Sequence, residues 1–88
     1  MKDLSELRQG IDQIDRQLLD LFINRMELCS EVGEYKRSKG LPVLDAQREK
    51  QVLAAKMELL EDPEYQTEVY EFFNSIMAIS RVLQTRIV

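Results

Sequence analysis

A positively charged residue interrupts a regular apolar series in the first part of the chain. Apolar residues recur there at alternating steps of three and four, which is the pattern of one helix face. Arg25 fills the gap in a series formed by Leu4, Leu7, Ile11, Ile14, Leu18, Leu21, Leu28 and Val32. Lys36 follows about three helical turns later and projects from almost the same face. Because an unpaired buried charge costs several kcal/mol or more, these two cations predict a pocket that binds an anion.

Further polar residues follow in the second half of the chain. Asp45, Arg48 and Glu49 are spaced by three and four residues, so they share one helix face. The same spacing is common in ion pairs on solvated surfaces. Ser80 falls inside an apolar seam and Gln84 lies one turn further; the apolar members of the seam are Val69, Phe73, Ile76, Leu83 and Ile87. A serine bonded to its own helix backbone and an exposed glutamine would also explain these two residues.

The combined residue types indicate the kind of ligand. The guanidinium group of arginine binds a carboxylate through two hydrogen bonds, whereas the ammonium group of lysine acts as a mobile point charge. At the backbone, Arg25 and Lys36 would stand about 16 Å apart along a helix, so their long side chains can converge on a small molecule. The set predicts a small dianion that carries a hydroxyl group. Arg8 would lie about 26 Å from Arg25, so it either reaches the site of a second subunit or is solvated.

Several classes of protein are disfavoured by composition. The net charge of −4 argues against nucleic acid as a partner, and no apolar run or signal-peptide pattern indicates a membrane or secretion. Histidine is absent and Cys29 is the only cysteine, so we expect no metal, no disulfide and a cytoplasmic location. Cys29 is interpreted as a small core residue rather than a nucleophile. An enzyme of this composition would act through electrostatics and positioning.

Three helices must position these residues within one all-α domain, residues 1–88. The first runs from about Asp3 to Ser38, and the second from Leu44 or Asp45 to Leu60. The third has Asp62 as N-cap and Pro63 in its first turn and ends near Arg86. The first helix would be about 50 Å long, whereas a compact domain of this size has a radius of gyration of about 12 Å. Its apolar face needs cover, so we predict an obligate homodimer.

The whole chain resembles the all-helical chorismate mutase family. The resemblance rests on Arg25, Glu31-Val32-Gly33, Lys36, Pro42-Val43, Asp45, Arg48, Glu49, Ser80 and Gln84. It implies an intertwined helical homodimer with two equivalent sites. The implied reaction is the Claisen rearrangement of chorismate to prephenate in phenylalanine and tyrosine biosynthesis, with no metal or organic cofactor. Members are often fused to another enzyme of the pathway.

The resemblance also implies roles for individual residues. Lys36 and Gln84 would donate to the ether oxygen of the substrate, and Glu49 would accept from its ring hydroxyl, helped by the backbone near Asp45. The substrate carboxylates would be held by Arg25, by Ser80 and by Arg8 of the partner chain. Arg48 would line the same cationic wall, Asp45 would mainly cap the second helix, and the apolar wall would include Val32 and Met77.

Two alternatives remain open at this stage. An isochorismate pyruvate lyase shares the fold, although its loop and second helix differ from the Asp45-x-x-Arg48-Glu49 pattern of this chain. A non-catalytic helical dimerisation or regulatory module would explain the long apolar series and the charged faces. It would not explain Arg25 and Ser80 inside apolar seams.

Overall fold

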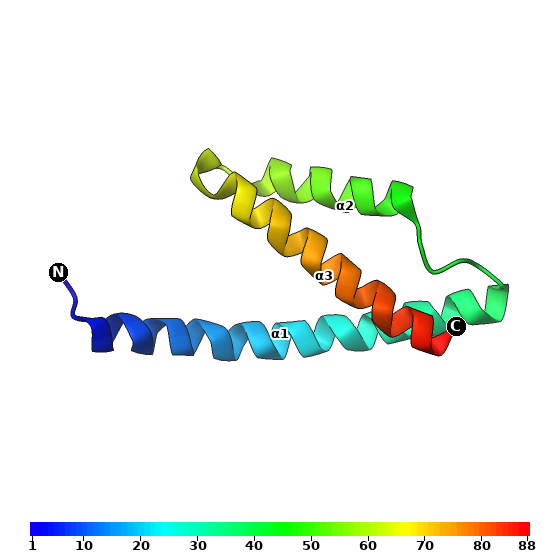
Figure 1. Cartoon of the computed structure of the whole chain (residues 1–88), viewed down its shortest axis with the longest axis horizontal. Coiled ribbons are helices and arrows are strands. Elements are labelled where there is room, and N and C mark those ends of the chain that lie inside the picture. The colour runs from blue at the N-terminus through cyan, green and yellow to red at the C-terminus, as the bar shows by residue number, and fades with distance from the viewer.

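The protein is an arrangement of three α-helices without strands. The computed structural model describes residues 1–88 and contains α1 (Leu4–Lys39), α2 (Ala46–Leu59), a short 3-10 turn η1 (Pro63–Tyr65) and α3 (Gln66–Ile87) (Figure 1). The predicted all-α class with one long and two shorter helices is confirmed. None of the helices is sufficiently long and apolar to span a membrane.

Local signals in the sequence account for the ends of α1. The Asp3 side chain caps the helix by accepting a hydrogen bond of 2.8 Å from the backbone N–H of Glu6. At the other end, Gly40 adopts a left-handed conformation with φ of 65°, which costs glycine little because it has no Cβ. The N–H of Leu41 then donates to the carbonyl oxygen of Lys36 at 2.8 Å and closes the last turn.

The start of the third helix differs from the prediction in one respect. Asp62 does act as an N-cap, accepting from the N–H of Glu64 at 3.0 Å, but the turn that it caps is 3-10 rather than α-helical. The Gln66 N–H closes this turn on the carbonyl oxygen of Pro63. The α-helix itself begins only at Gln66. The tight turn uses the fixed φ of proline and needs no N–H from it.

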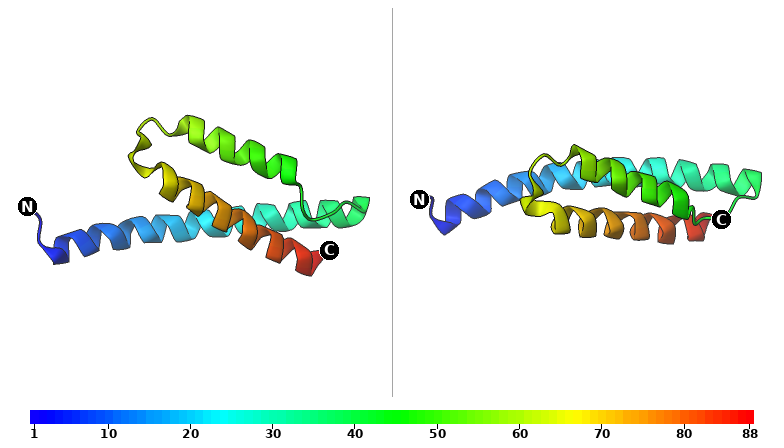
Figure 2. Two further views of the ribbon diagram at one scale, coloured as in Figure 1. Left: turned by 45° about the horizontal axis from the view of Figure 1, so that its top comes forward. Right: turned by 90° about the horizontal axis from the view of Figure 1, so that it is seen from above.

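The middle layer of the structure is α3, which packs on α1 along one side and on α2 along the other. Helices α1 and α2 do not pack against each other, and the N-terminal part of α1 projects alone (Figures 1 and 2). The molecule measures 55 × 25 × 15 Å with a radius of gyration of 16.2 Å. A compact domain of this length would have a radius of about 12 Å, so a single chain is unusually extended.

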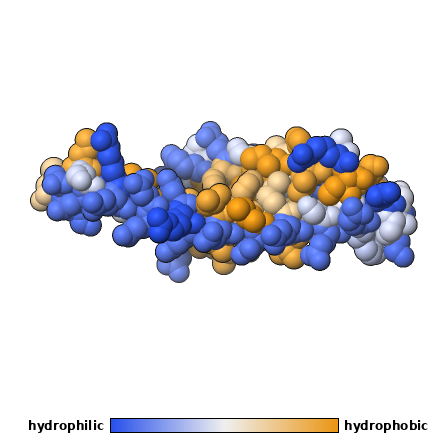
Figure 3. All heavy atoms as spheres, turned by 90° about the horizontal axis from the view of Figure 1, so that it is seen from below, coloured by the Kyte–Doolittle hydropathy of each residue, from blue (hydrophilic) through white to orange (hydrophobic).

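Very little of the chain is buried. Only five of the 88 residues are shielded from solvent, namely Gly33 on α1 and Ile76, Met77, Ser80 and Gln84 on α3. The apolar series of α1 was predicted to need cover from a second copy of the chain, and in the single chain all its apolar members are exposed, Leu21 and Leu28 at 64% and 62%. Helix α3 covers only part of α1 and leaves this series exposed. Figure 3 shows apolar side chains gathered on one face of the elongated molecule.

Candidate active site

The first polar contact of the candidate site joins α1 to α3. Arg25 Nη1 donates to Ser80 Oγ at 2.6 Å, and Ser80 Oγ donates in turn to the carbonyl oxygen of Ile76 at 2.9 Å. Ser80 therefore bonds to its own helix backbone, as the simpler interpretation expected, and also accepts a hydrogen bond from Arg25. Cys29 is half-buried beside them, with its thiol 3.4 Å from Ser80 Oγ and 3.6 Å from Arg25 Nη1.

A second contact lies further along the same two helices. Lys36 Nζ donates to the carbonyl oxygen of Val43 at 2.6 Å and to Gln84 Oε1 at 3.0 Å. Gln84 Nε2 donates to the carbonyl oxygen of Cys29 at 3.3 Å, and the side chain is buried. The alternative of an exposed glutamine is therefore wrong. An ammonium carries three N–H groups and an amide two, so Lys36 and Gln84 each keep one N–H free to donate to a ligand.

The electrostatic character of this site follows from the absence of acidic partners. The chain contains two ion pairs, Arg37 with Glu34 and Arg81 with Glu49, and neither involves Arg25 or Lys36. The two cations contact only uncharged acceptors. Because partly buried cations favour an anionic partner, this cluster can hold carboxylates.

The close approach of α1 and α3 depends on Gly33, which sequence reasoning named only as part of the motif that resembles the family. Gly33 is buried, and a Cβ built on it would lie 3.2 Å from Ile87 Cδ1 and 3.3 Å from Gln84 Cγ. These distances are tighter than ordinary contacts. The bare backbone at Gly33 therefore gives the Gln84 side chain its place against α1.

The polar residues of α2 divide into separate roles. Asp45 caps α2 by accepting from the N–H of Arg48 at 3.0 Å, which confirms the capping role expected of it. Glu49 forms an ion pair with Arg81 of α3 instead of pairing within its own helix. The prediction missed Arg81. Its position next to Ser80 and one turn before Gln84 was the available signal.

Four predicted site residues make no hydrogen bond or ion pair with this cluster within one chain, namely Asp45 and Glu49, whose contacts are given above, and Arg48 and Arg8. The Arg48 side chain is exposed and makes no hydrogen bond or ion pair, and Arg8 is exposed on the projecting part of α1 (Figure 1). The two residues predicted to form the apolar wall of the site differ in burial, since Met77 is 5% exposed and Val32 is 45% exposed. No group of three or more acidic or cysteine side chains is placed to hold a metal ion.

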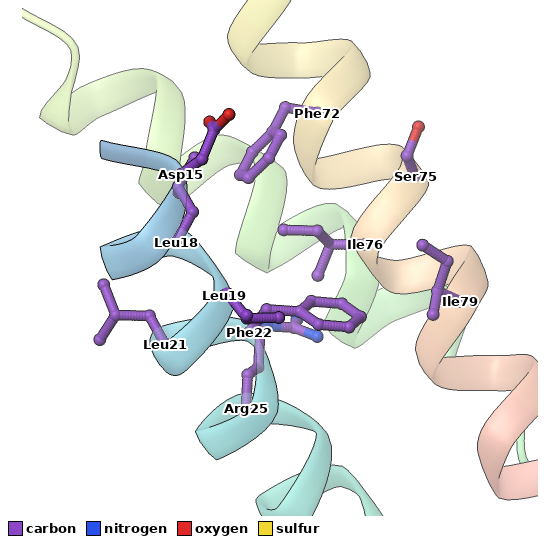
Figure 4. A pocket seen from close by; sticks show the side chains of 10 residues that line it. All are labelled: Asp15, Leu18, Leu19, Leu21, Phe22, Arg25, Phe72, Ser75, Ile76 and Ile79. Carbon is purple, nitrogen blue, oxygen red and sulfur yellow. The ribbon is translucent and has the colours of Figure 1, made fainter. Parts of the chain in front are cut away.

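A large apolar groove adjoins the Arg25 end of the cluster. It encloses about 520 Å³ between α1 and α3 and is lined by Asp15, Leu18, Leu19, Leu21, Phe22, Arg25, Phe72, Ser75, Ile76 and Ile79 (Figure 4). Neither Lys36 nor Gln84 lines it. The hydrogen-bonding chemistry therefore identifies the candidate site better than the groove does, and the cluster is not enclosed by a single chain.

Comparison with known proteins assigns the chain to a family. The family model for chorismate mutase type II matches residues 7–85. The chain belongs to the chorismate mutase type II family. The matched range contains the whole set of predicted site residues, which are Arg8, Arg25, Lys36, Asp45, Arg48, Glu49, Ser80 and Gln84.

Individual relatives include enzymes of different length and name. The T-protein of Haemophilus influenzae is 45% identical over 56 residues, which cover 64% of this chain and 15% of the relative. The chorismate mutase of Methanocaldococcus jannaschii is 38% identical over 52 residues, covering 59% of this chain and 52% of the relative. The 4-amino-4-deoxychorismate mutase of Streptomyces pristinaespiralis is 39% identical over 51 residues, which cover 58% of this chain and 40% of the relative. The chain thus spans about half or less of each of these relatives.

Proposed function

We propose that the chain is a chorismate mutase that converts chorismate to prephenate and serves phenylalanine and tyrosine biosynthesis in the cytoplasm. The observation that carries the proposal is the convergence of Lys36 and Gln84, whose contact leaves each with one free N–H. Membership of the chorismate mutase type II family supports the same activity.

The chemistry of this rearrangement suits the residues present. The ether bond of chorismate breaks while a carbon–carbon bond forms within the same molecule, and partial negative charge grows on the ether oxygen. Lys36 Nζ and Gln84 Nε2 donate to that oxygen and stabilise the transition state more than the ground state. Arg25 and Ser80 hold a carboxylate of chorismate and keep the substrate's own side chain folded over its ring, which lowers the entropic part of the barrier.

The active form in this proposal is a homodimer. A row of exposed apolar residues along α1 supports it, because such a face is unfavourable in water; the row includes Leu4, Leu7, Ile11, Ile14, Leu18 and Leu21. A second copy covers this face and closes the site. Arg8 of one subunit then contributes to the site of its partner, where it binds a substrate carboxylate.

The proposal is tested by incubating the purified chain with chorismate and following its loss and the formation of prephenate. Turnover many orders of magnitude above the uncatalysed rate is expected. Parallel assays use isochorismate and 4-amino-4-deoxychorismate. Release of pyruvate from isochorismate without conversion of chorismate would favour the lyase, and no conversion of any substrate would favour the non-catalytic module.

A further inference from the structure

One ion pair in the chain connects two helices. Arg81 of α3 and Glu49 of α2 have side chains that are 36% and 25% exposed. The other pair, Arg37 with Glu34, lies within α1 at 3.8 Å, and both of its side chains are more than 60% exposed. Partial burial reduces screening by water and salt, so the pair between α2 and α3 interacts more strongly with charges nearby.

The position of this pair relates it to the proposed site. Arg81 directly follows Ser80 and precedes Gln84 by three residues, while Glu49 lies one turn after Asp45. The family resemblance implies that Glu49 accepts a hydrogen bond from the ring hydroxyl of a substrate with two negative charges, and the proposed function includes this role. A free carboxylate at this place would repel that substrate. The ion pair uses one carboxylate oxygen of Glu49, and the other remains available as an acceptor.

We propose that Arg81 is a positioning residue that acts through Glu49. It holds the carboxylate in one orientation toward the ring hydroxyl and offsets its charge, so that a dianionic substrate binds beside it. This inference rests on the proposed chorismate mutase activity. Loss of Arg81 should weaken substrate binding and raise KM more than it lowers kcat, because the repulsion acts on substrate and transition state alike.

Two other roles of Arg81 make different predictions. The pair could serve only to hold α2 against α3, in which case breaking it from either side would have the same effect. Arg81 could instead touch the substrate directly, since it also borders a hollow of about 590 Å³ lined by Val43, Leu44, Ala78, Arg81, Val82, Thr85 and Arg86. In that case the loss of Arg81 would be equally harmful whether or not Glu49 carries a charge.

The experiment compares Arg81→Ala, Glu49→Gln and the double variant, with chorismate as substrate. Arg81→Ala leaves an unpaired carboxylate and should raise KM about tenfold. The double variant should bring KM back to within about twofold of Glu49→Gln, because the repelling charge is gone. Added salt should reduce the defect of Arg81→Ala by screening. Arg37→Ala breaks the exposed pair and is the matched control, expected to leave KM unchanged.

The outcomes separate this inference from the proposed function. An active wild type whose Arg81→Ala variant keeps its high KM in the double variant would overturn the inference in favour of direct contact. If all three variants lower thermal stability equally and leave KM unchanged, the inference is overturned, and the ion pair serves only to hold α2 against α3. Arg81→Gln provides the same comparison if Arg81→Ala does not fold. A wild type that does not convert chorismate would refute the proposed function, and this inference with it.

Discussion

The side chains of Lys36 and Gln84 meet across 48 positions of the chain, with Lys36 Nζ 3.0 Å from Gln84 Oε1. Lysine can only donate, so the contact requires the amide oxygen of Gln84 to face Lys36. The amide nitrogen must then point the other way, where it donates to the carbonyl oxygen of Cys29. One side chain thus orients the other, and in the proposed function each donates its remaining N–H to the same ligand.

Lys36→Ala and Arg25→Ala should each lower turnover of chorismate by at least about two orders of magnitude. Removing one preoriented donor typically costs about 3–4 kcal/mol of transition-state stabilisation. Steady-state kinetics measure the loss, and sedimentation checks that the assembly persists. Lys39→Ala is the matched control, because Lys39 is exposed and its ammonium lies over the Tyr35 ring instead of in the site. Near-normal turnover in either of the first two variants would contradict the roles assigned to them.

Gln84→Glu should make catalysis dependent on acid. A glutamate donates a hydrogen bond only when protonated, whereas an amide donates at any pH. The rate of the variant should therefore fall as pH rises, by up to about tenfold per pH unit above the pKa of the introduced carboxyl group. The wild type should show a flat rate from mildly acidic to neutral pH. Parallel pH–rate profiles test this, and a steep acid requirement in the wild type would argue against donation by Gln84.

Gly33→Ala should reduce activity more than stability. The new methyl group would press on Gln84 Cγ and Ile87 Cδ1, which lie 3.3 Å and 3.2 Å from its position, and would displace the amide. The gain in helix propensity, about 1 kcal/mol, offsets part of the cost to folding. We expect kcat to fall about tenfold, since catalytic donors tolerate little displacement.

Gly10→Ala is the control for this substitution. Gly10 lies on the same helix with no atom within 4 Å of an added Cβ. Here the helix propensity acts alone, so the free energy of unfolding should rise by up to about 1 kcal/mol without loss of activity. Thermal denaturation and kinetics of both variants provide the comparison. Equal kcat in the two variants would mean that Gly33 does not position Gln84.

Mixing two inactive variants tests whether Arg8 acts in the partner's site. Arg8→Ala and Arg25→Ala chains should each form inactive homodimers. After unfolding and refolding together, half of the dimers are mixed, and each mixed dimer has one intact site. Activity should therefore return to about a quarter of the wild-type value per chain. If Arg8 acts in its own subunit, mixing will restore no activity, and if it acts in neither site, the Arg8→Ala homodimer will itself be active.

The sequence alone was sufficient to predict the three helices and to name candidate residues for the site. Helix formation depends on neighbours three and four positions away, so the helices and the cap at Asp62 could be predicted from local patterns. Ser80 was recognised because it interrupts an apolar seam. The 3-10 turn at Pro63 was missed, since the same cap and proline also begin α-helices.

Only the tertiary structure decided which of these residues meet. The contacts of Lys36 with Gln84 and of Glu49 with Arg81 join different helices, and the close approach at Gly33 depends on how α1 and α3 cross. Helix crossing is set by side-chain packing over the whole interface, which no local pattern determines. For the same reason the apolar series of α1 indicates a face that needs cover, while the single chain leaves it exposed because α3 crosses α1 at an angle and covers only part of it (Figure 1).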